Sequence, residues 1–157
     1  MNRLVQTASP YTIETMRYRK GAHCVYKTEY HIVWTPRYRR KLFVNNIKAE
    51  CESYFKTMPD LQTDIEVIAV NVQPDHIHMV LIIPPRIAVA AVVKYLKVQS
   101  AKTFKAKYGF MQKAIWGRGG IWSRGYFVST VGVDEKTILA YVANQEKEDK
   151  GQLQFEL

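Results

Sequence analysis

The run from Pro74 to Ile83 constrains the fold most, because apolar and polar side chains alternate along much of it. Successive side chains of a strand point to opposite faces, so His76 and His78 would share one face. The other face would carry the core residues Ile77, Met79, Leu81 and Ile83. Two imidazoles on a rigid strand supply half of a metal site, although a His-x-His strand taken alone is more often ordinary surface.

Two more strands and a helix are predicted before this run. Residues 24–34 are rich in β-branched and aromatic side chains and end near Pro36. Residues 65–72 also favour a strand, and the turn at 73–75 is so short that this strand and the histidine strand form an antiparallel hairpin. Asn45 or Asn46 can cap a helix from residue 47 to about 58, whose apolar residues share one face.

After the histidine strand, a long helix is predicted over residues 87–108, ended by Gly109. Its inner stripe is Val89, Val92, Val93, Leu96, Ser100 and Phe104. A fourth strand is expected over residues 121–131, bent where Gly125 interrupts it, and a last helix runs from residue 134 to about 150, with Gly151 after it.

The order β-α-β-β-α-β is that of the ferredoxin-like α+β fold, in which two helices cover one face of an antiparallel sheet. The other face, with the two histidines, would be open to the additional C-terminal helix, a partner or a ligand. A length of 157 residues indicates one domain. We place it at residues 23–151, after a basic N-terminal extension at 1–22 and before a short tail at 152–157.

The charge balance indicates a polyanionic partner. Lys and Arg total 23 against 14 Asp and Glu, a net charge of +9, which favours nucleic acid first and an anionic membrane surface second. The densest basic cluster is Arg37, Tyr38, Arg39, Arg40 and Lys41. No apolar run is long enough to span a bilayer, and the N-terminus has no apolar signal region. Cys24 and Cys51 match no metal or redox spacing, so we expect a cytoplasmic protein.

The last predicted helix offers a second half for the histidine site. Tyr141 and Gln145 are four residues apart and therefore lie on one helical face. If the helix docks over the open sheet face, a phenol and an amide oxygen arrive beside the imidazoles, and a divalent ion accepts both imidazole and carbonyl ligands. The alternative is a half-buried tyrosine with a solvated glutamine.

Taken in order, these motifs resemble those of the HUH single-tyrosine transposases, the IS200-like family of small insertion sequences that move as single-stranded DNA. The resemblance covers about residues 17–150. It is carried by the stretches YHIVWTPRYRRK at 30–41, DHIH at 75–78, IWSRGYF at 121–127 and YVANQ at 141–145. His-x-His alone is unspecific, but the ordered set is highly specific.

The resemblance implies that Tyr141 is the nucleophile and that His76, His78 and Gln145 hold Mg²⁺, with Mn²⁺ as a substitute. Cleavage would give a 5′-phosphotyrosine and a free 3′-hydroxyl, so that strands are rejoined without a nucleotide cofactor. The implied substrate is single-stranded DNA with hairpins at the element ends. The implied assembly is a homodimer in which the tyrosine helix, connected through Gly132, can complete the neighbouring subunit's site.

The basic residues would then hold DNA. The cluster at 37–41 could bind phosphates, with Tyr38 as a stacking surface. A second track could be Lys94, Lys97, Lys102 and Lys105, although each alone is more readily a solvated charge. Asp75 either orients a histidine or only forms the turn, and His23 and His31 are expected to be structural.

Three other functions are compatible with the motifs. A host-adopted relative would cut or bind chromosomal repeats without moving an element. A non-catalytic ferredoxin-like module would bind nucleic acid and use the histidines structurally. A metal-dependent phosphodiesterase would use activated water, and Tyr141 would be dispensable.

Overall fold

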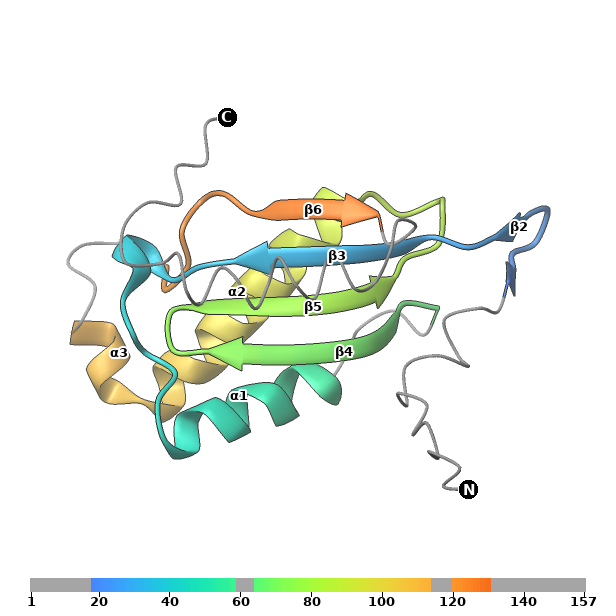
Figure 1. Ribbon diagram of the computed structural model, residues 1–157. Coiled ribbons are helices and arrows are strands. Elements are labelled where there is room, and N and C mark those ends of the chain that lie inside the picture. Colours follow the sequence, from blue (N-terminus) through green and yellow to red (C-terminus); the bar gives the residue numbers. More distant parts are fainter. Residues whose placement is uncertain (1–17, 59–63, 114–119, 131–157) are drawn as a thin grey trace, which may run out of the picture.

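The main sheet of the protein has four antiparallel strands (Figure 1). The computed structural model describes residues 18–58, 64–113 and 120–130. The strands are β3 (Glu29–Trp34), β4 (Glu66–Gln73), β5 (His76–Ile82) and β6 (Phe127–Thr130), in the spatial order β4-β5-β3-β6. This order, with helical connections from β3 to β4 and from β5 to β6, is that of the ferredoxin-like α+β fold, as predicted.

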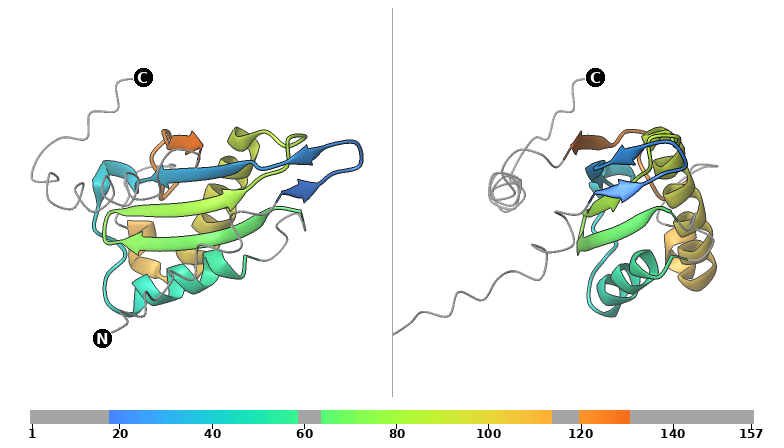
Figure 2. Two further views of the ribbon diagram at one scale, coloured as in Figure 1. Left: turned by 45° about the vertical axis from the view of Figure 1, so that its right-hand side comes forward. Right: turned by 90° about the vertical axis from the view of Figure 1, so that its right-hand side faces the viewer.

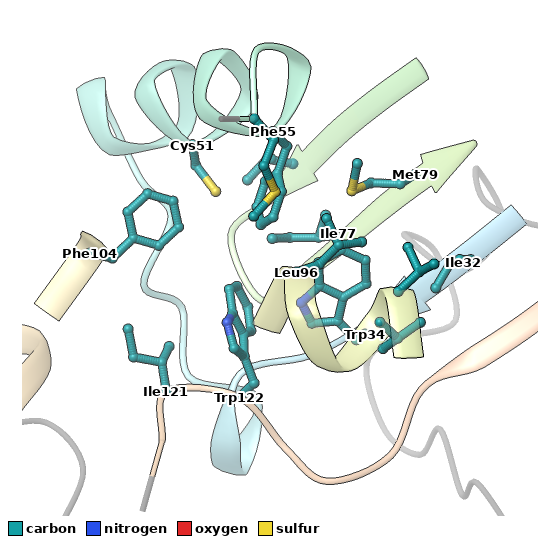
Figure 3. Close-up of a cluster of buried hydrophobic side chains, with 14 of the residues drawn as sticks. Ile32, Trp34, Cys51, Phe55, Ile77, Met79, Leu96, Phe104, Ile121 and Trp122 are labelled. Atoms are coloured by element: carbon teal, nitrogen blue, oxygen red, sulfur yellow. The ribbon is translucent and has the colours of Figure 1, made fainter. Parts of the chain in front are cut away.

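Two helices cover one face of the sheet (Figure 2). They are α1 (Asn46–Lys56) and α2 (Val89–Lys107), and the short α3 (Gly109–Lys113) follows α2. Their buried residues recur at helical spacing, Cys51 and Phe55 in α1 and Leu96, Ser100 and Phe104 in α2. Figure 3 shows the apolar side chains among them meeting Ile77 and Met79 of β5 and the rings of Trp34 and Trp122 in one core.

The histidine hairpin forms at the predicted position. β4 and β5 pair across a turn at Pro74 and Asp75, with Gln73 opposite His76 and Asn71 opposite His78. Ile77 and Met79 are fully buried on the helix-covered face, so His76 and His78 lie on the opposite face. Among the described residues, no helix lies on that face (Figure 2).

The predicted strand at 24–34 is divided between two sheets. β2 (Val25–Tyr26) pairs with β1 (Arg19–Lys20) in a small hairpin that projects from the main sheet, and only β3 joins the main sheet (Figure 1). The predicted extension at residues 1–22 therefore contains the strand β1. Arg19 fixes the hairpin through two hydrogen bonds from its guanidinium to the Glu66 carboxylate of β4, at 3.0 and 2.8 Å.

The predicted strand at 121–131 is wrong over its first part, because β6 begins only at Phe127. Lys97 of α2 gives the reason: its Nζ donates to the backbone oxygens of Ser123, Arg124 and Gly125, which takes those groups from a strand ladder. Trp122 keeps a single bridge to Pro36. The long helix α2 ends at Lys107, close to the predicted end at Gly109, and the separate short helix α3 was not predicted.

The predicted last helix, with Tyr141 and Gln145, lies outside the described residues, as do residues 1–17 and the tail at 152–157. Within the described ranges, no helix has the length and apolar character needed to cross a membrane. Cys24 is exposed and Cys51 is buried, and both are free thiols.

Candidate metal centre on the open sheet face

His76 and His78 lie side by side on β5, on the face away from the helices. Their ring centroids are 4.7 Å apart and the ring planes are inclined by 79°. Both residues are buried, with 5% and 4% of their surface exposed. The alternation of a regular strand places them there, and the buried Ile77 between them fixes which face they take.

One nitrogen of each ring is held by a neighbouring side chain. His76 Nδ1 lies 2.7 Å from Asp75 Oδ1, and His78 Nδ1 lies 3.3 Å from His31 Nε2. The rings of His31 and His78 stack, with centroids 5.4 Å apart and planes within 7°. These contacts restrain the orientation of both rings, as the outer partners of metal-binding histidines do.

The other nitrogens remain available. The Nε2 atoms of His76 and His78 are buried, and neither has a hydrogen-bond partner in the described part of the chain. Buried polar atoms are nearly always paired, so two unpaired nitrogens on adjacent rings call for a ligand. When Nδ1 carries the proton and donates it to Asp75 or His31, Nε2 presents a lone pair that can bind a metal ion.

The surroundings of His78 and His31 favour the neutral form of these two imidazoles. Burial, then the charges of His76 and His31, lowers the pKa of His78 to about 3. Burial also lowers the pKa of His31. A metal ion binds only the unprotonated nitrogen, so a neutral His78 is competent to bind a metal ion well below neutral pH.

Asp75 connects the histidines to the basic cluster. Its Oδ1 bonds His76, and its Oδ2 accepts a hydrogen bond from Arg39 Nη2 at 3.1 Å. The hydrogen bond from His76, with the charges of His76 and Arg39, holds the pKa of this carboxyl below its usual range. Asp75 therefore combines both roles considered from the sequence, since it forms the turn and orients a histidine.

The cluster at 37–41 presents its side chains in different directions. Arg37–Arg39 form a 3₁₀ turn in which Tyr38 and Arg39 have positive φ values of 58° and 48°. This left-handed conformation is costly for residues other than glycine. It leaves Tyr38 78% exposed while Arg39 reaches the partly buried turn at Asp75. Arg40 and Lys41 are exposed, and Arg37 is partly exposed.

The described residues supply no third candidate ligand beside His76 and His78. Within them, no group of three or more His, Cys, Asp or Glu side chains could hold a metal ion. The predicted third ligand, Gln145, and the predicted nucleophile, Tyr141, both lie outside the described ranges. The expectation for His31 is a structural role, and the structure places this residue against the candidate site. His23 is exposed between β1 and β2.

The family model and the most similar relatives of this chain all belong to one family. Residues 24–145 match the family model described as "Transposase IS200 like". The chain is 31% identical over 136 residues to the ISDra2 transposase TnpA of Deinococcus radiodurans, covering 86% of this chain and 96% of that protein. It is 33% identical over 129 residues to the transposase for insertion sequence element IS200 of Salmonella typhimurium, covering 82% and 84%.

A solved structure agrees with the sequence relatives. The crystal structure of a Deinococcus radiodurans protein described as a transposase superposes with a TM-score of 0.67 at 30% identity. The match covers 81% of this chain and 97% of that chain, so it includes nearly all of the solved protein.

Proposed function

This chain belongs to the IS200-like transposase family, and from that premise we propose that it cleaves and rejoins single-stranded DNA at the hairpin-marked ends of a mobile element. The observation that carries the proposal is the pair of buried Nε2 atoms on His76 and His78, which lack hydrogen-bond partners among the described residues. A purely structural histidine pair would be expected to satisfy those atoms within the fold.

In this proposal His76, His78 and Gln145 hold Mg²⁺ or Mn²⁺. The donor chemistry fits, because imidazole nitrogen and amide oxygen are both ligands of hard or borderline divalent ions. Once bound, the ion supplies Lewis-acid polarisation of the phosphate, an effect of several kcal/mol. Asp75 and His31 keep the two rings oriented by holding their Nδ1 atoms.

Tyr141 is the proposed nucleophile. The phenol releases its proton to solvent, and its oxygen forms a bond to phosphorus while the bond from phosphorus to the 3′-oxygen breaks. The 3′-oxygen takes up a proton from solvent and leaves as a hydroxyl. The product is a 5′-phosphotyrosine. Attack by the 3′-hydroxyl of another strand end reverses these bond changes and restores the phenol, so no nucleotide cofactor is consumed.

The basic cluster at 37–41 is the proposed DNA contact beside this site. Exposed Tyr38 can stack on a base, and Arg37, Arg40 and Lys41 can bind phosphates. Arg39 is already committed in part, because it bonds the carboxylate that holds His76. A strand bound at the cluster would thus lie next to the residues that orient the metal ligands.

The proposal is tested by covalent capture. Incubation with a single-stranded hairpin oligonucleotide and Mg²⁺ should give a protein–DNA adduct that survives denaturing electrophoresis, and Tyr141→Phe should give none. His76→Ala and His78→Ala should lose cleavage but keep most DNA binding. Absence of an adduct on hairpins taken from the element ends would count against the proposal. Continued cleavage by Tyr141→Phe would instead support a mechanism with activated water.

We also propose a homodimer whose tyrosine helix completes the neighbouring site. Mixing inactive His76→Ala and Tyr141→Phe subunits tests this directly. If the site is shared, one site of the mixed dimer regains an intact histidine pair and an intact tyrosine, and cleavage returns to a fraction of the wild-type rate. If each subunit builds its own site, the mixture stays inactive.

A further inference from the structure

Three side chains connect the basic cluster at 37–41 to the candidate metal centre. Arg39 Nη2 donates to Asp75 Oδ2 at 3.1 Å, and Asp75 Oδ1 lies 2.7 Å from His76 Nδ1. The exposed fraction of the side chain falls along this series, from 30% in Arg39 to 18% in Asp75 and 7% in His76. The series therefore begins at a cation that a ligand in solution can reach and ends at a buried ring.

The backbone around Arg39 is fixed, so its side chain is the part that can respond to a ligand. Arg37 N donates to the carbonyl oxygen of Ile121 at 2.8 Å, and Phe43 N donates to that of Pro74 at 3.1 Å. Phe43 is fully buried, which anchors the segment after β3 beside the turn between β4 and β5 (Figure 1). Arg39 has a φ of 48°, a conformation that persists in such a residue only where the surrounding structure imposes it. The fold thus holds this guanidinium at the histidine hairpin against the backbone preference of its residue.

The guanidinium weakens the support that the carboxylate gives to the ring. A carboxylate that accepts the second N–H of a metal-binding histidine makes the ring a better ligand, because its negative charge raises the basicity of the ring. The positive charge of Arg39 beside Asp75 offsets part of that negative charge. While Arg39 bonds Asp75, His76 is therefore oriented, but it is a weaker metal ligand than the carboxylate alone would make it.

A DNA phosphate would compete with Asp75 for the same guanidinium. Arginine forms charge-assisted hydrogen bonds with both carboxylate and phosphate. We propose that Arg39 is a positioning residue that leaves Asp75 for a phosphate when a strand binds at the basic cluster. The carboxylate then acts on His76 with its full charge, so that DNA binding tightens metal binding, and the metal ion tightens DNA binding by the same factor. We expect a factor of about 5, at the low end for coupled sites, because Asp75 keeps its contact with His76 throughout.

Mn²⁺ affinity in the absence of DNA tests the sign of the effect. All variants are made in the full chain carrying Tyr141→Phe, so that no strand is cleaved, and electron paramagnetic resonance measures the affinity. Arg39→Gln should bind Mn²⁺ about 5-fold more tightly than the parent, whereas Arg39→Lys keeps a cation and should bind like the parent. If Arg39 only held Asp75 in place, Arg39→Gln would bind Mn²⁺ more weakly. That result, or an unchanged affinity, would overturn the inference.

A second titration, with a saturating hairpin oligonucleotide, measures the coupling itself. Direct contact between the DNA and the ion contributes equally in the parent and in Arg39→Gln. The factor by which DNA tightens Mn²⁺ binding should therefore be about 5-fold smaller in Arg39→Gln. Adding Arg39→Gln to Asp75→Asn should change neither the affinity nor this factor, because the carboxylate through which Arg39 acts is already gone. Equal factors in the parent and Arg39→Gln would overturn the inference.

Two controls separate this effect from a general effect of charge. Arg40→Gln removes a neighbouring exposed charge and should weaken DNA binding, but it should leave the Mn²⁺ affinity without DNA unchanged. Arg86→Gln breaks a surface ion pair with Asp64 and should change neither affinity. Thermal unfolding checks that each variant retains the fold. A gain in Mn²⁺ affinity in Arg40→Gln equal to that in Arg39→Gln would overturn the inference.

Nuclear magnetic resonance of the histidine rings gives a readout without metal. In EDTA, with isotope-labelled histidine, saturating oligonucleotide should move the Nδ1 proton of His76 downfield in the parent, as a stronger hydrogen bond to Asp75 requires. In Arg39→Gln this proton should already lie near the shifted position, and DNA should move it little. A proton that keeps its position in the parent when DNA binds would contradict the transfer of Arg39.

The inference rests on the proposed function for its metal site and its DNA contact, but the two can fail separately. If the covalent adduct forms while Arg39→Gln binds Mn²⁺ like the parent, strand transfer stands and the role given to Arg39 falls. If Arg39→Gln tightens Mn²⁺ binding and loses the coupling while no adduct forms on any hairpin, Arg39 couples metal and DNA in a protein without the proposed strand transfer.

Discussion

Asp75→Asn replaces the carboxylate that holds His76 by a neutral group of the same shape. In the structure, Asp75 Oδ1 lies 2.7 Å from His76 Nδ1, and Oδ2 accepts a hydrogen bond from the Arg39 guanidinium at 3.1 Å. An amide oxygen can still accept from His76, so the ring is not released. The substitution removes the negative charge that makes the imidazole a better donor to a metal ion.

The expected effects differ in size. Loss of such an outer partner weakens metal binding by about 10- to 100-fold, which corresponds to about 1.4–2.7 kcal/mol. The ion pair with Arg39 is partly exposed, with 30% and 18% of the two side chains accessible, so its loss should lower the free energy of unfolding by less than about 1 kcal/mol. Metal affinity should therefore fall far more than stability.

Mn²⁺ titration followed by electron paramagnetic resonance measures the affinity, and urea unfolding measures the stability. Asp64→Asn is the matched control, because Asp64 pairs with Arg86 on the surface and is not part of the histidine site. Affinity of Asp75→Asn within about twofold of the wild type would refute the role given to this carboxylate. An equal loss in Asp64→Asn would refute it as well.

Three further changes test other parts of the structure. Ser100→Ala should lower the free energy of unfolding, measured by chemical denaturation, by about 1–3 kcal/mol. The reason is that the buried Trp122 Nε1, which donates to Ser100 Oγ at 2.9 Å, would lose its acceptor. An unchanged free energy of unfolding would show that this hydrogen bond does not stabilise the fold. The pKa of His78, about 3, is kept low first by burial and then by neighbouring histidine charges, so the unfolded chain binds a proton there before the folded chain does. In EDTA, the free energy of unfolding should therefore fall as pH drops from about 6.5 towards 3, and this group contributes up to about 1.4 kcal/mol per pH unit. His78→Gln should make the free energy of unfolding depend less steeply on pH over this range. An equally steep dependence in His78→Gln would contradict this reasoning. Tyr38→Gly relieves a positive φ but raises the conformational entropy of the unfolded chain, so the free energy of unfolding should change by less than about 1 kcal/mol. The affinity for single-stranded DNA should fall. Unaltered affinity would show that Tyr38 is not part of the proposed DNA contact.

Local patterns are enough to predict the histidine hairpin. The alternation around Ile77 sets which face His76 and His78 take, and a turn of this length permits only an antiparallel pairing. The inner stripe of the long helix is also predictable, and it includes Ser100, whose helical spacing marks it as buried although nothing local indicates its bond to Trp122.

The features that could not be predicted depend on contacts between residues far apart in the sequence. His31 reaches His78 only because of the register of β3 against β5, which places Val33 opposite His78 and His31 opposite Val80. The irregular path at 123–125 depends on Lys97, which belongs to a different element much earlier in the chain. The bond from Arg39 to Asp75 needs a positive φ in a residue other than glycine, which propensity disfavours.

The metal ligand Gln145, the nucleophile Tyr141, the Mg²⁺ or Mn²⁺ cofactor and the homodimer remain predictions. The described residues supply one half of the site, the two oriented imidazoles, and the predicted other half lies outside them. The central claim is therefore that a tyrosine from the last segment of the chain attacks DNA beside these histidines.

Mass spectrometry of the covalent product tests that claim most directly. After reaction with a hairpin oligonucleotide and Mg²⁺, nuclease trimming and trypsin digestion, we expect a nucleotide 5′-phosphate on the peptide of residues 137–147, whose single tyrosine is Tyr141. The modification should be absent in EDTA and in His76→Ala. A nucleotide attached to any other peptide, or cleaved DNA with a free 5′-phosphate and no modified peptide, would contradict it.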